Sequence, residues 1–471
     1  MTFYLAFIVV YSLGLMTLGI VIGRHVRASG DFFVAGRRLG PGLLFATLLA
    51  ANIGAGSTVG ATGLGYQYGL AAWWWVGSAA IGSLALAFVI GPRMRREAER
   101  LQLKTVGEYL ERRYNGTVAG GISALLWIGT LSILAGQLIG IGSVLRTILG
   151  VPHGLGALIG GALIGTYFVS GGLASSVWVH VVQLTIKMVG FALALPLAMH
   201  DAGGWGRVLA DAPADPAYWS AWQHGAIGWP LLFMLAPAFV VSPGVLQKVY
   251  GARDDRAVRW GVGLNALGLF AFALVPVLLG MIARVLHPDL PSRDVALPTV
   301  LTLDLPPAIG ALGLAALFSA ELSAADAVLF MLSTSLSQDL YRRYWRPDAG
   351  DRQVLTVARL AAVFGLVAAT GFAVLQPTVT DALSIFYSLL TVSLFVPIVA
   401  GLCLPKTRTV DAGVAIVCGV AALVAGHWLT GGKGIGYATP SILGLGTAIA
   451  SFCVSYAAGR LLTPRTAEGH V

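Results

Sequence analysis

The sequence predicts an all-α polytopic membrane protein with thirteen transmembrane helices, and three observations lead to that fold class. The chain of 471 residues is 57% hydrophobic and only 11% charged, whereas soluble domains carry about a quarter charged residues. Its mean hydropathy is +0.80. Its apolar residues form separate runs of about 20 residues, the length that crosses a bilayer as a helix. We therefore expect a lipid bilayer around most of the chain.

The predicted helices follow one another with short connections. Their expected positions are residues 3–23, 41–66, 70–92, 117–147, 154–170, 173–198, 227–249, 260–284, 308–340, 355–376, 383–404, 410–428 and 439–460. No soluble segment or long linker separates these runs, so we treat residues 1–471 as a single transmembrane domain.

Basic residues decide the expected orientation. The first run, residues 3–23, has no Lys or Arg before it and is followed by Arg24 and Arg27. With the N-terminus outside, most of the 30 Lys and Arg residues fall on the cytoplasmic side, as the positive-inside rule requires. We therefore expect an N-out, C-in topology. Because these connecting segments account for the formal charge of +9, no nucleic-acid partner is expected.

Polar stretches that interrupt apolar runs are the main indication of function. Residues Ala50–Ser57 bring Gly54 and Gly56 into the second run, and Ser319–Asp326 place hydroxyl and carboxylate groups inside the ninth. Glycines allow a membrane helix to unwind, and the freed backbone carbonyls can replace the water around a small cation. A third interruption, Val241–Gly244, contains a Ser-Pro-Gly sequence that cannot continue a regular helix. This pattern favours a transporter over an enzyme.

Short motifs spread over nearly the whole chain resemble those of the sodium/solute symporter family. They are Gly36-Arg37-Arg38-Leu39, Ala50-Ala51-Asn52-Ile53, Thr105-Val106-Gly107-Glu108-Tyr109-Leu110, Gly171-Gly172-Leu173, Val245-Leu246-Gln247-Lys248, Ser333-Thr334 and Asp339-Leu340-Tyr341. Each motif is short, but their order and spacing together are typical of the family.

The resemblance implies a leucine-transporter-type core built from two inverted repeats of five helices each, residues 41–198 and 227–404. One helix, at residues 3–23, precedes this core, and two helices within residues 410–460 follow it. In this fold the first helix of each repeat is broken, which agrees with the interruptions in the second and seventh runs.

The resemblance also implies a sodium site between the second and ninth helices. Its ligands would be the backbone carbonyls of Ala50, Ile53 and Ala320 and the hydroxyl of Ser323, with the carboxylate of Asp326 as a further candidate. Hard oxygen ligands of this kind suit an alkali cation. The family usually has a second hydroxyl where this chain has Ala324, so one side-chain ligand is missing.

Four ionisable residues in or beside this region are candidates for ion coupling: His180, Lys187, Glu321 and Asp326. His180 replaces the aspartate of a family motif that reads Trp-Thr-Asp-x-x-Gln. Buried ionisable groups are costly in a membrane and usually have partners or a function. One interpretation is that His180–Asp326 or Lys187–Glu321 pairs lock helices together. Another is that these groups add a carboxylate to the sodium site, carry a proton, or hold a lysine charge where sodium binds.

The resemblance places a solute site near the middle of the membrane. The matching positions are Ser57, Val76, Ser242 and Tyr387, with Thr391 nearby. A sugar is disfavoured, because the sugar-binding members carry carboxylate and amide groups where this chain has Ser57 and Val76. The segment Gly69–Trp73 resembles the choline-transporter branch, but three adjacent tryptophans on a helix point in different directions and favour an interfacial belt. We expect a small organic solute, such as an amino-acid-like, monocarboxylate or amine compound.

The sequence therefore predicts a sodium-driven symporter of a small organic solute, working by alternating access in the cell membrane. Na⁺ is the expected co-transported ion, and a proton-coupled or uncoupled carrier on the same fold is the alternative. An enzyme is not expected, because the sequence has no nucleophile elbow, phosphate loop or metal-ligand spacing. Neither the solute nor the oligomeric state follows from the sequence.

Overall fold

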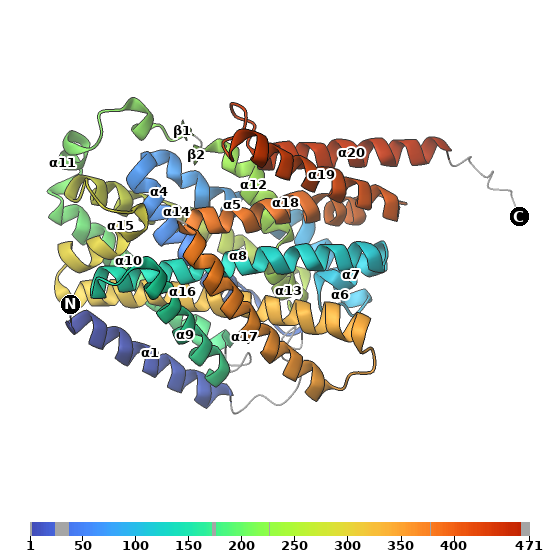
Figure 1. Cartoon of the computed structure of the whole chain (residues 1–471), viewed down its shortest axis with the longest axis horizontal. Helices are drawn as coiled ribbons and strands as arrows, with labels where there is room; N and C mark the ends of the chain where they lie inside the picture. The colour runs from blue at the N-terminus through green and yellow to red at the C-terminus, as the bar shows by residue number, and fades with distance from the viewer. Residues whose placement is uncertain (1, 24–36, 172–175, 226, 377, 463–471) are drawn as a thin grey trace, which may run out of the picture.

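The computed structural model describes residues 2–23, 37–171, 176–225, 227–376 and 378–462. Within these ranges the chain is almost entirely helical (Figure 1). Strands β1 (Gln223–His224) and β2 (Ile227–Gly228) form a small antiparallel sheet in which Gln223 pairs with Gly228. Ten helices in the described part are long and apolar enough to cross a membrane. The predicted all-α membrane fold is thus confirmed, while the count of thirteen and the orientation remain predictions. Arg24, Arg27, Gly36, Gly172 and Leu173 lie outside the described residues.

The first half of the chain contains one leading helix and a set of helices that follow the predicted runs. They are α1 (Thr2–Gly23), α3 (Pro41–Asn52), η2 (Ala55–Ser57), α4 (Val59–Tyr68), η3 (Gly69–Ala72), α5 (Trp73–Ala85), η4 (Leu86–Ile90), α6 (Gly91–Arg100), α7 (Val106–Arg113), α8 (Gly116–Leu149), α9 (His153–Gly171) and α10 (Ser176–Asp201).

The second half begins with a connecting segment and ends in two helices at the edge of the bundle. Its helices are α11 (Gly204–Asp211), η5 (Pro216–Trp219), η6 (Trp229–Leu231), α12 (Leu232–Val241), α13 (Pro243–Tyr250), α14 (Asp255–Leu286), η7 (Arg293–Val295), α15 (Ala296–Thr299), η8 (Val300–Asp304), α16 (Pro307–Thr334), η9 (Ser335–Trp345), α17 (Asp351–Leu375), α18 (Val379–Cys403), α19 (Thr409–Thr430) and α20 (Pro440–Leu462).

Local signals explain where several of these helices begin and end. The side chain of Asn115 accepts a hydrogen bond from the N–H of Val118 and caps α8, and Asp254 caps α14 in the same way through Ala257. Gly150 ends α8 in the left-handed conformation, with a φ of 68°. These signals divide the apolar runs into elements that match the predicted spans within a few residues.

Both predicted helix breaks are present. Between α3 and α4 the chain leaves the helix at Ile53, makes the short 3₁₀ turn η2 and then resumes a helix at Val59. Between α12 and α13, Ser242 has a ψ of 122° and ends the first segment just before Pro243. The broken helices leave backbone carbonyls without intrahelical partners in the middle of the protein.

A glycine is required at the first break. A Cβ atom on Gly54 would lie 2.5 Å from the Cβ of Ala324 on α16 and 2.9 Å from the side-chain oxygen of Gln137 on α8. No other residue would fit without moving one of these helices. Gly54 therefore allows the unwound segment to lie directly against α8 and α16.

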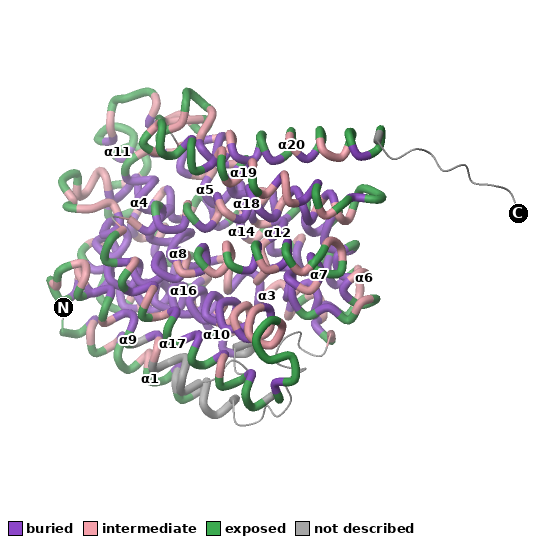
Figure 2. The backbone as a smooth tube through the Cα atoms, turned by 45° about the vertical axis from the view of Figure 1, so that its right-hand side comes forward, coloured by how far each residue is buried: buried purple, intermediate pink, exposed green. Residues whose placement is uncertain are grey.

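The broken helices lie in the centre of the bundle. Helix α10 packs against α3 and α16, and α14 packs against α3, α4 and α5. Helices α19 and α20 pack on each other and on α18 at one edge, and α1 lies at another edge (Figure 1). Figure 2 shows that buried positions are concentrated in the interior and that α20 has exposed positions along its length. The apolar side chains of Val454 and Leu461 on α20 are exposed. Such side chains are expected to contact lipid.

The two ends of the bundle carry different connections. Helices α6 and α7, from the arginine-rich connection, lie at one end, and α11 lies at the other (Figure 1). Arg95 on α6 pairs with Asp255 at the start of α14, at 2.6 Å between Nε and Oδ1. Which of these ends is cytoplasmic and which extracellular remains a prediction. The division into two inverted repeats, residues 41–198 and 227–404, remains a prediction.

Candidate functional site

The residues predicted to hold sodium lie together. The hydroxyl of Ser323 on α16 donates to the carbonyl oxygen of Ala50 at 2.9 Å and lies 3.2 Å from the carbonyl oxygen of Ala320. The carbonyl of Ile53, at the end of α3, faces the same point, because Lys187 donates to it as well as to Ala50 and Ser323. The structure thus brings four oxygen groups from two helices into one cluster, which we call the oxygen cluster.

The break at the end of α3 explains why the carbonyls of Ala50 and Ile53 have no helical hydrogen-bond donor. In a continuous helix the N–H of Gly54 would donate to the carbonyl of Ala50, four residues earlier. Here the N–H of Gly54 instead donates to the hydroxyl of Ser57 at 3.1 Å. The carbonyl of Ala50 is therefore left to accept from side chains of α10 and α16.

The centre of the oxygen cluster contains a cationic side chain. Lys187 on α10 is fully buried, and its Nζ donates to Ser323 Oγ at 2.6 Å, to the Ala50 carbonyl at 2.7 Å and to the Ile53 carbonyl at 3.0 Å. An ammonium group has three protons, so these contacts use all its donors. Of the interpretations left open by the sequence, a lysine charge at the predicted sodium position agrees with this geometry.

The two other ionisable candidates on α16 have different surroundings. Glu321 is fully buried and accepts a hydrogen bond from the hydroxyl of Thr58 at 3.3 Å. Asp326 Oδ2 lies 3.5 Å from His180 Nε2 on α10, and both side chains are almost fully buried. The His180–Asp326 pairing is therefore present, and it connects α10 to α16 beside the oxygen cluster.

A cavity of about 430 Å³ lies next to the oxygen cluster. Four of the five predicted solute-site residues line it, namely Ser57, Val76, Ser242 and Tyr387, and so do Asp326 and His180. The fifth, Thr391, is buried and donates to the carbonyl of Met234, so it joins α18 to α12. A largely apolar cavity with a few polar groups is typical of small-molecule sites.

Several cavity residues were not predicted from the sequence. Trp75 lines the cavity, and its ring lies 6.2 Å from that of Tyr387. Gln137 and Lys248 also line it, and Lys248 Nζ donates to the carbonyl of Thr47 at 2.7 Å. Gln137 could have been identified from the sequence, because it is a lone amide in a long apolar helix.

The three adjacent tryptophans do not form a cage. Trp73 packs on Phe270, with ring centroids 5.7 Å apart, and Trp74 donates to the carbonyl of Ala221 at an exposed position. Only Trp75 of the three lines the cavity. Their different directions agree with the expectation for consecutive residues of a helix.

Comparison with known proteins decides the family. Residues 32–419 match the model of the sodium:solute symporter family, which is most of the chain. The chain belongs to the sodium:solute symporter family. It is accordingly an integral membrane transporter that moves a solute together with Na⁺, and not an enzyme. The predicted resemblance is thus confirmed.

Similar proteins include other symporters of this family. The sodium/pantothenate symporter of Escherichia coli is 28% identical, with 72% of this chain and 71% of that protein covered. The sodium/glucose cotransporter of Vibrio parahaemolyticus is 26% identical, with 73% and 68% covered. The outward-open structure of a Na⁺-coupled sialic acid symporter has the same fold, with a TM-score of 0.80, 18% identity and 97% of each chain covered.

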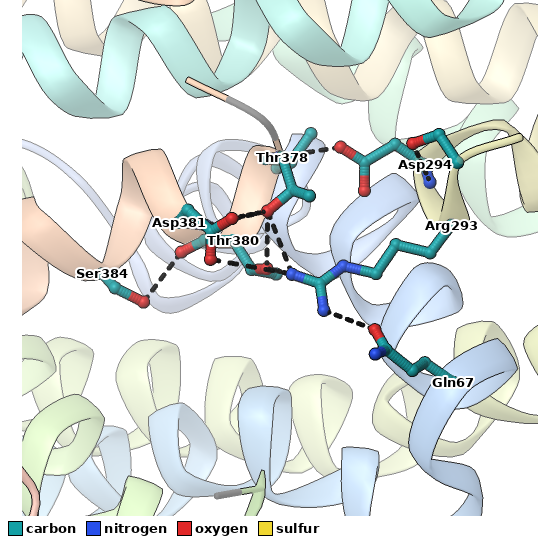
Figure 3. Close-up of polar contacts among 9 residues, drawn as sticks. Gln67, Arg293, Asp294, Thr378, Thr380, Asp381 and Ser384 are labelled. Carbon is teal, nitrogen blue, oxygen red and sulfur yellow. Dashed lines mark hydrogen bonds and ion pairs between the residues drawn. The ribbon is translucent and has the colours of Figure 1, made fainter. Parts of the chain in front are cut away.

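A second polar region of the symporter lies at the end predicted to be extracellular. Arg293 in η7 donates to Gln67 on α4 at 2.7 Å, to Thr378 at 3.0 Å and to Thr380 at 2.8 Å, and it lies 3.7 Å from Asp381 (Figure 3). These contacts join α4, η7 and the start of α18. We call this group the Arg293 network.

The residue after Arg293 strengthens the same junction. Asp294 is almost fully buried and accepts a hydrogen bond from the N–H of Val379 at 2.8 Å. Burial raises the pKa of the Asp294 carboxyl to about 6. Asp294 therefore holds η7 against the start of α18 through a group whose charge depends on pH.

Proposed function

We propose that this symporter carries a small organic solute through the cavity beside the oxygen cluster, by alternating access. The observation that supports this most directly is the position of the cavity, which is lined by Asn52, Ser57 and Ser242 at both helix breaks. A solute bound there would contact the unwound segment that also supplies Ala50 and Ile53 to the oxygen cluster. Solute and cation sites would then share one structural element, as coupling requires.

The cavity favours an inward-facing arrangement. Besides the residues at the helix breaks, it is lined by Leu39, Lys248 and Gly251, which lie at or just beyond helix ends predicted to be cytoplasmic. The predicted extracellular end is held together by the Arg293 network. Alternating access would open this network and close the cavity at Leu39 and Gly251.

The solute class follows from the composition of the cavity. Its lining is mostly apolar, with side chains such as Val76, Leu235 and Phe239, while Lys248, His180 and Asp326 supply the charged and titratable groups. Relatives in the family include transporters named for pantothenate, glucose and sialic acid. We propose an organic solute with an apolar body and one charged or strongly polar group, in preference to a neutral sugar, which needs several fixed polar partners.

Uptake into proteoliposomes tests this function. The purified symporter would be reconstituted and offered radiolabelled monocarboxylates, amino acids, amines and sugars, with an inward sodium gradient and with an equal potassium gradient. We expect accumulation of one of the first three classes under the sodium gradient only. Substituting Val76 with Trp, which would fill the cavity, should abolish that uptake. Equal uptake under both gradients would contradict sodium-driven transport of that solute.

A further inference from the structure

The oxygen cluster and the side chain of Lys187 are chemically matched. A monovalent cation needs several oxygen groups around it in place of water, and the ammonium of Lys187 already has three of the four predicted ligands within 3.0 Å. The cluster contains only neutral groups, namely carbonyls of Ala50, Ile53 and Ala320 and the hydroxyl of Ser323. A sodium ion bound by the same oxygens would overlap the position of Nζ and be repelled by its charge.

We propose that Lys187 is a tethered cation that competes with sodium for the oxygen cluster, so that sodium binds there only after the lysine side chain withdraws. This inference rests on the proposed sodium ligands and on sodium-driven transport. In this transport cycle, the ammonium of Lys187 and sodium occupy the oxygen cluster in turn. The ammonium connects α10 to α3 and α16 when sodium is elsewhere, and sodium takes over the connection between α3 and α16 when it binds.

The structure offers a second position for the displaced ammonium. Glu321 lies two residues before Ser323 on α16, it is fully buried, and it attracts the charge of Lys187. Its Oε1 accepts from Thr58, but its Oε2 has no hydrogen-bond partner among the described residues. A buried carboxylate oxygen without a partner is costly. An ammonium that moves from the oxygen cluster to Glu321 would satisfy it.

Other charged groups around Lys187 are consistent with a short movement toward Glu321. The groups that face it from neighbouring elements are Lys248 on α13 and Glu321 on α16, and the His180–Asp326 pair joins α10 to α16 further along. Lys248 repels the ammonium, whereas Glu321 attracts it. The field around Lys187 therefore directs the displaced side chain toward Glu321.

The residue that follows Ser323 adds no oxygen to the cluster. Ala324 has no polar atom in its side chain, and it packs against Gly54 at the break. With one ligand fewer, the oxygen cluster holds a free ion less strongly. A tethered cation loses less translational freedom than a free ion when it binds, so Lys187 is an effective competitor.

Direct binding of ²²Na⁺ to the purified full chain tests the proposal. Lys187→Met removes the charge while keeping the side-chain length, and Lys433→Met makes the same change at an exposed position outside the site. We expect Lys187→Met to bind sodium at least about tenfold more tightly than the unsubstituted chain, and Lys433→Met to bind as the unsubstituted chain does. Adding Ser323→Ala to Lys187→Met should remove the gain.

A second variant keeps the test decisive if Lys187→Met does not fold. Glu321→Gln leaves Lys187 in place but removes the charge that would attract the displaced ammonium, so sodium binding should weaken by about tenfold. Folding of each variant is verified by thermal unfolding. Unchanged sodium affinity in a folded Lys187→Met, or in a folded Glu321→Gln where the first variant does not fold, overturns the proposal.

Failure of this inference is distinguishable from failure of the proposed function. Solute uptake by the unsubstituted chain under sodium and potassium gradients tests sodium-driven transport without any change at Lys187. If uptake requires sodium but Lys187→Met binds sodium as before, only the competition by Lys187 is wrong. If Lys187→Met gains sodium binding while uptake by the unsubstituted chain ignores sodium, the competition stands and the driving ion of the proposed function is wrong.

Discussion

Gln137 accepts a hydrogen bond from the backbone N–H of Ala55, with 2.9 Å between Oε1 and the amide nitrogen. This contact joins α8 to the turn η2, at the point where the chain is unwound between α3 and α4. The N–H of Ala55 lies in a stretch that lacks regular helical hydrogen bonds, so Gln137 satisfies a backbone donor that the break exposes. The same side chain lines the cavity.

Substituting Gln137 with Leu should therefore disturb the break more than the packing of α8. The change keeps a similar volume but leaves the N–H of Ala55 without its acceptor, at a cost of about 1–3 kcal/mol. We expect a lower melting temperature together with weaker sodium binding. Gln137→Glu keeps an acceptor and should retain more of both properties. Sodium binding that is unchanged in a destabilised Gln137→Leu would show that the break does not organise the cation site.

Ser323 supplies the side-chain oxygen of the oxygen cluster, in which the other predicted ligands are backbone carbonyls. Ser323→Ala should reduce the sodium response of uptake by about tenfold in apparent affinity, while expression and melting temperature change less. Ser393 on α18 bonds within its own helix to the carbonyl of Leu389, so Ser393→Ala is a matched control. A full sodium response in Ser323→Ala would remove this residue from the site.

The His180–Asp326 pair leaves a choice between a structural and a coupling role. Removing one partner of this buried pair leaves the other polar group without its partner, at a cost of about 1–3 kcal/mol. We expect His180→Gln and Asp326→Asn each to lower the melting temperature, and the double variant to lower it by less than the sum. Sodium-dependent uptake measured between pH 6 and pH 8 in the same variants separates the roles. If additive losses in stability accompany an altered pH profile of uptake, coupling is the better explanation.

The sequence predicted the overall architecture because helix breaks and apolar runs are local properties. Gly54 and Gly56 allow a helix to unwind, and the Ser-Pro-Gly sequence after Val241 cannot continue a regular helix; both breaks are present. The convergence of Ala50 and Ser323 came from the family resemblance, since these residues are separated by most of the chain. A lysine charge in the oxygen cluster was one of several interpretations that the sequence left open, and short patterns could not decide among them. The reach of Lys187 depends on how α10 packs against α3 and α16, and this is a tertiary property.

Gln137 and Trp75 illustrate the same limit. A single amide in the long apolar helix α8 signals a buried partner, but the sequence does not show that the partner is the backbone of Ala55. Each of three consecutive tryptophans has the same local signal, and only the packing of α5 turns Trp75 toward the cavity. Identifying residues in a site requires the direction of each side chain, which short patterns do not contain.

The Arg293 network should control access to the predicted extracellular side. Arg293→Ala removes hydrogen bonds to Gln67, Thr378 and Thr380. If the state with the extracellular side closed becomes less stable by about 1.4 kcal/mol, the equilibrium shifts tenfold toward the open state. Ser143 lines a second cavity, which is separate from the solute cavity and is also lined by Arg293 and Thr378, so a cysteine introduced at Ser143 reports the opening. In a background without Cys403, Cys418 and Cys453, an impermeant thiol reagent added outside cells should label it faster in Arg293→Ala.

The control for this measurement is Arg207→Ala on the exposed helix α11, where Arg207 pairs only with Asp211 among the described residues. That variant should leave labelling at position 143 unchanged. Labelling from outside would also support the predicted N-out orientation. Equal labelling rates with and without Arg293 would mean that the network does not close this side.

Asp294 predicts a pH-dependent stability at the same junction. Burial raises the pKa of the Asp294 carboxyl from 3.8 to about 6. At pH values between these two, the folded state therefore keeps a proton that the unfolded state has released. This contribution to stability is fully present below about pH 4 and is lost as the pH rises through 6. Asp294→Asn keeps an oxygen that can accept from the N–H of Val379 but cannot ionise. The melting temperature of Asp294→Asn minus that of the unsubstituted chain should therefore increase from pH 4 to pH 7. A difference that stays constant over this interval would show that the Asp294 carboxyl does not control the stability of the junction.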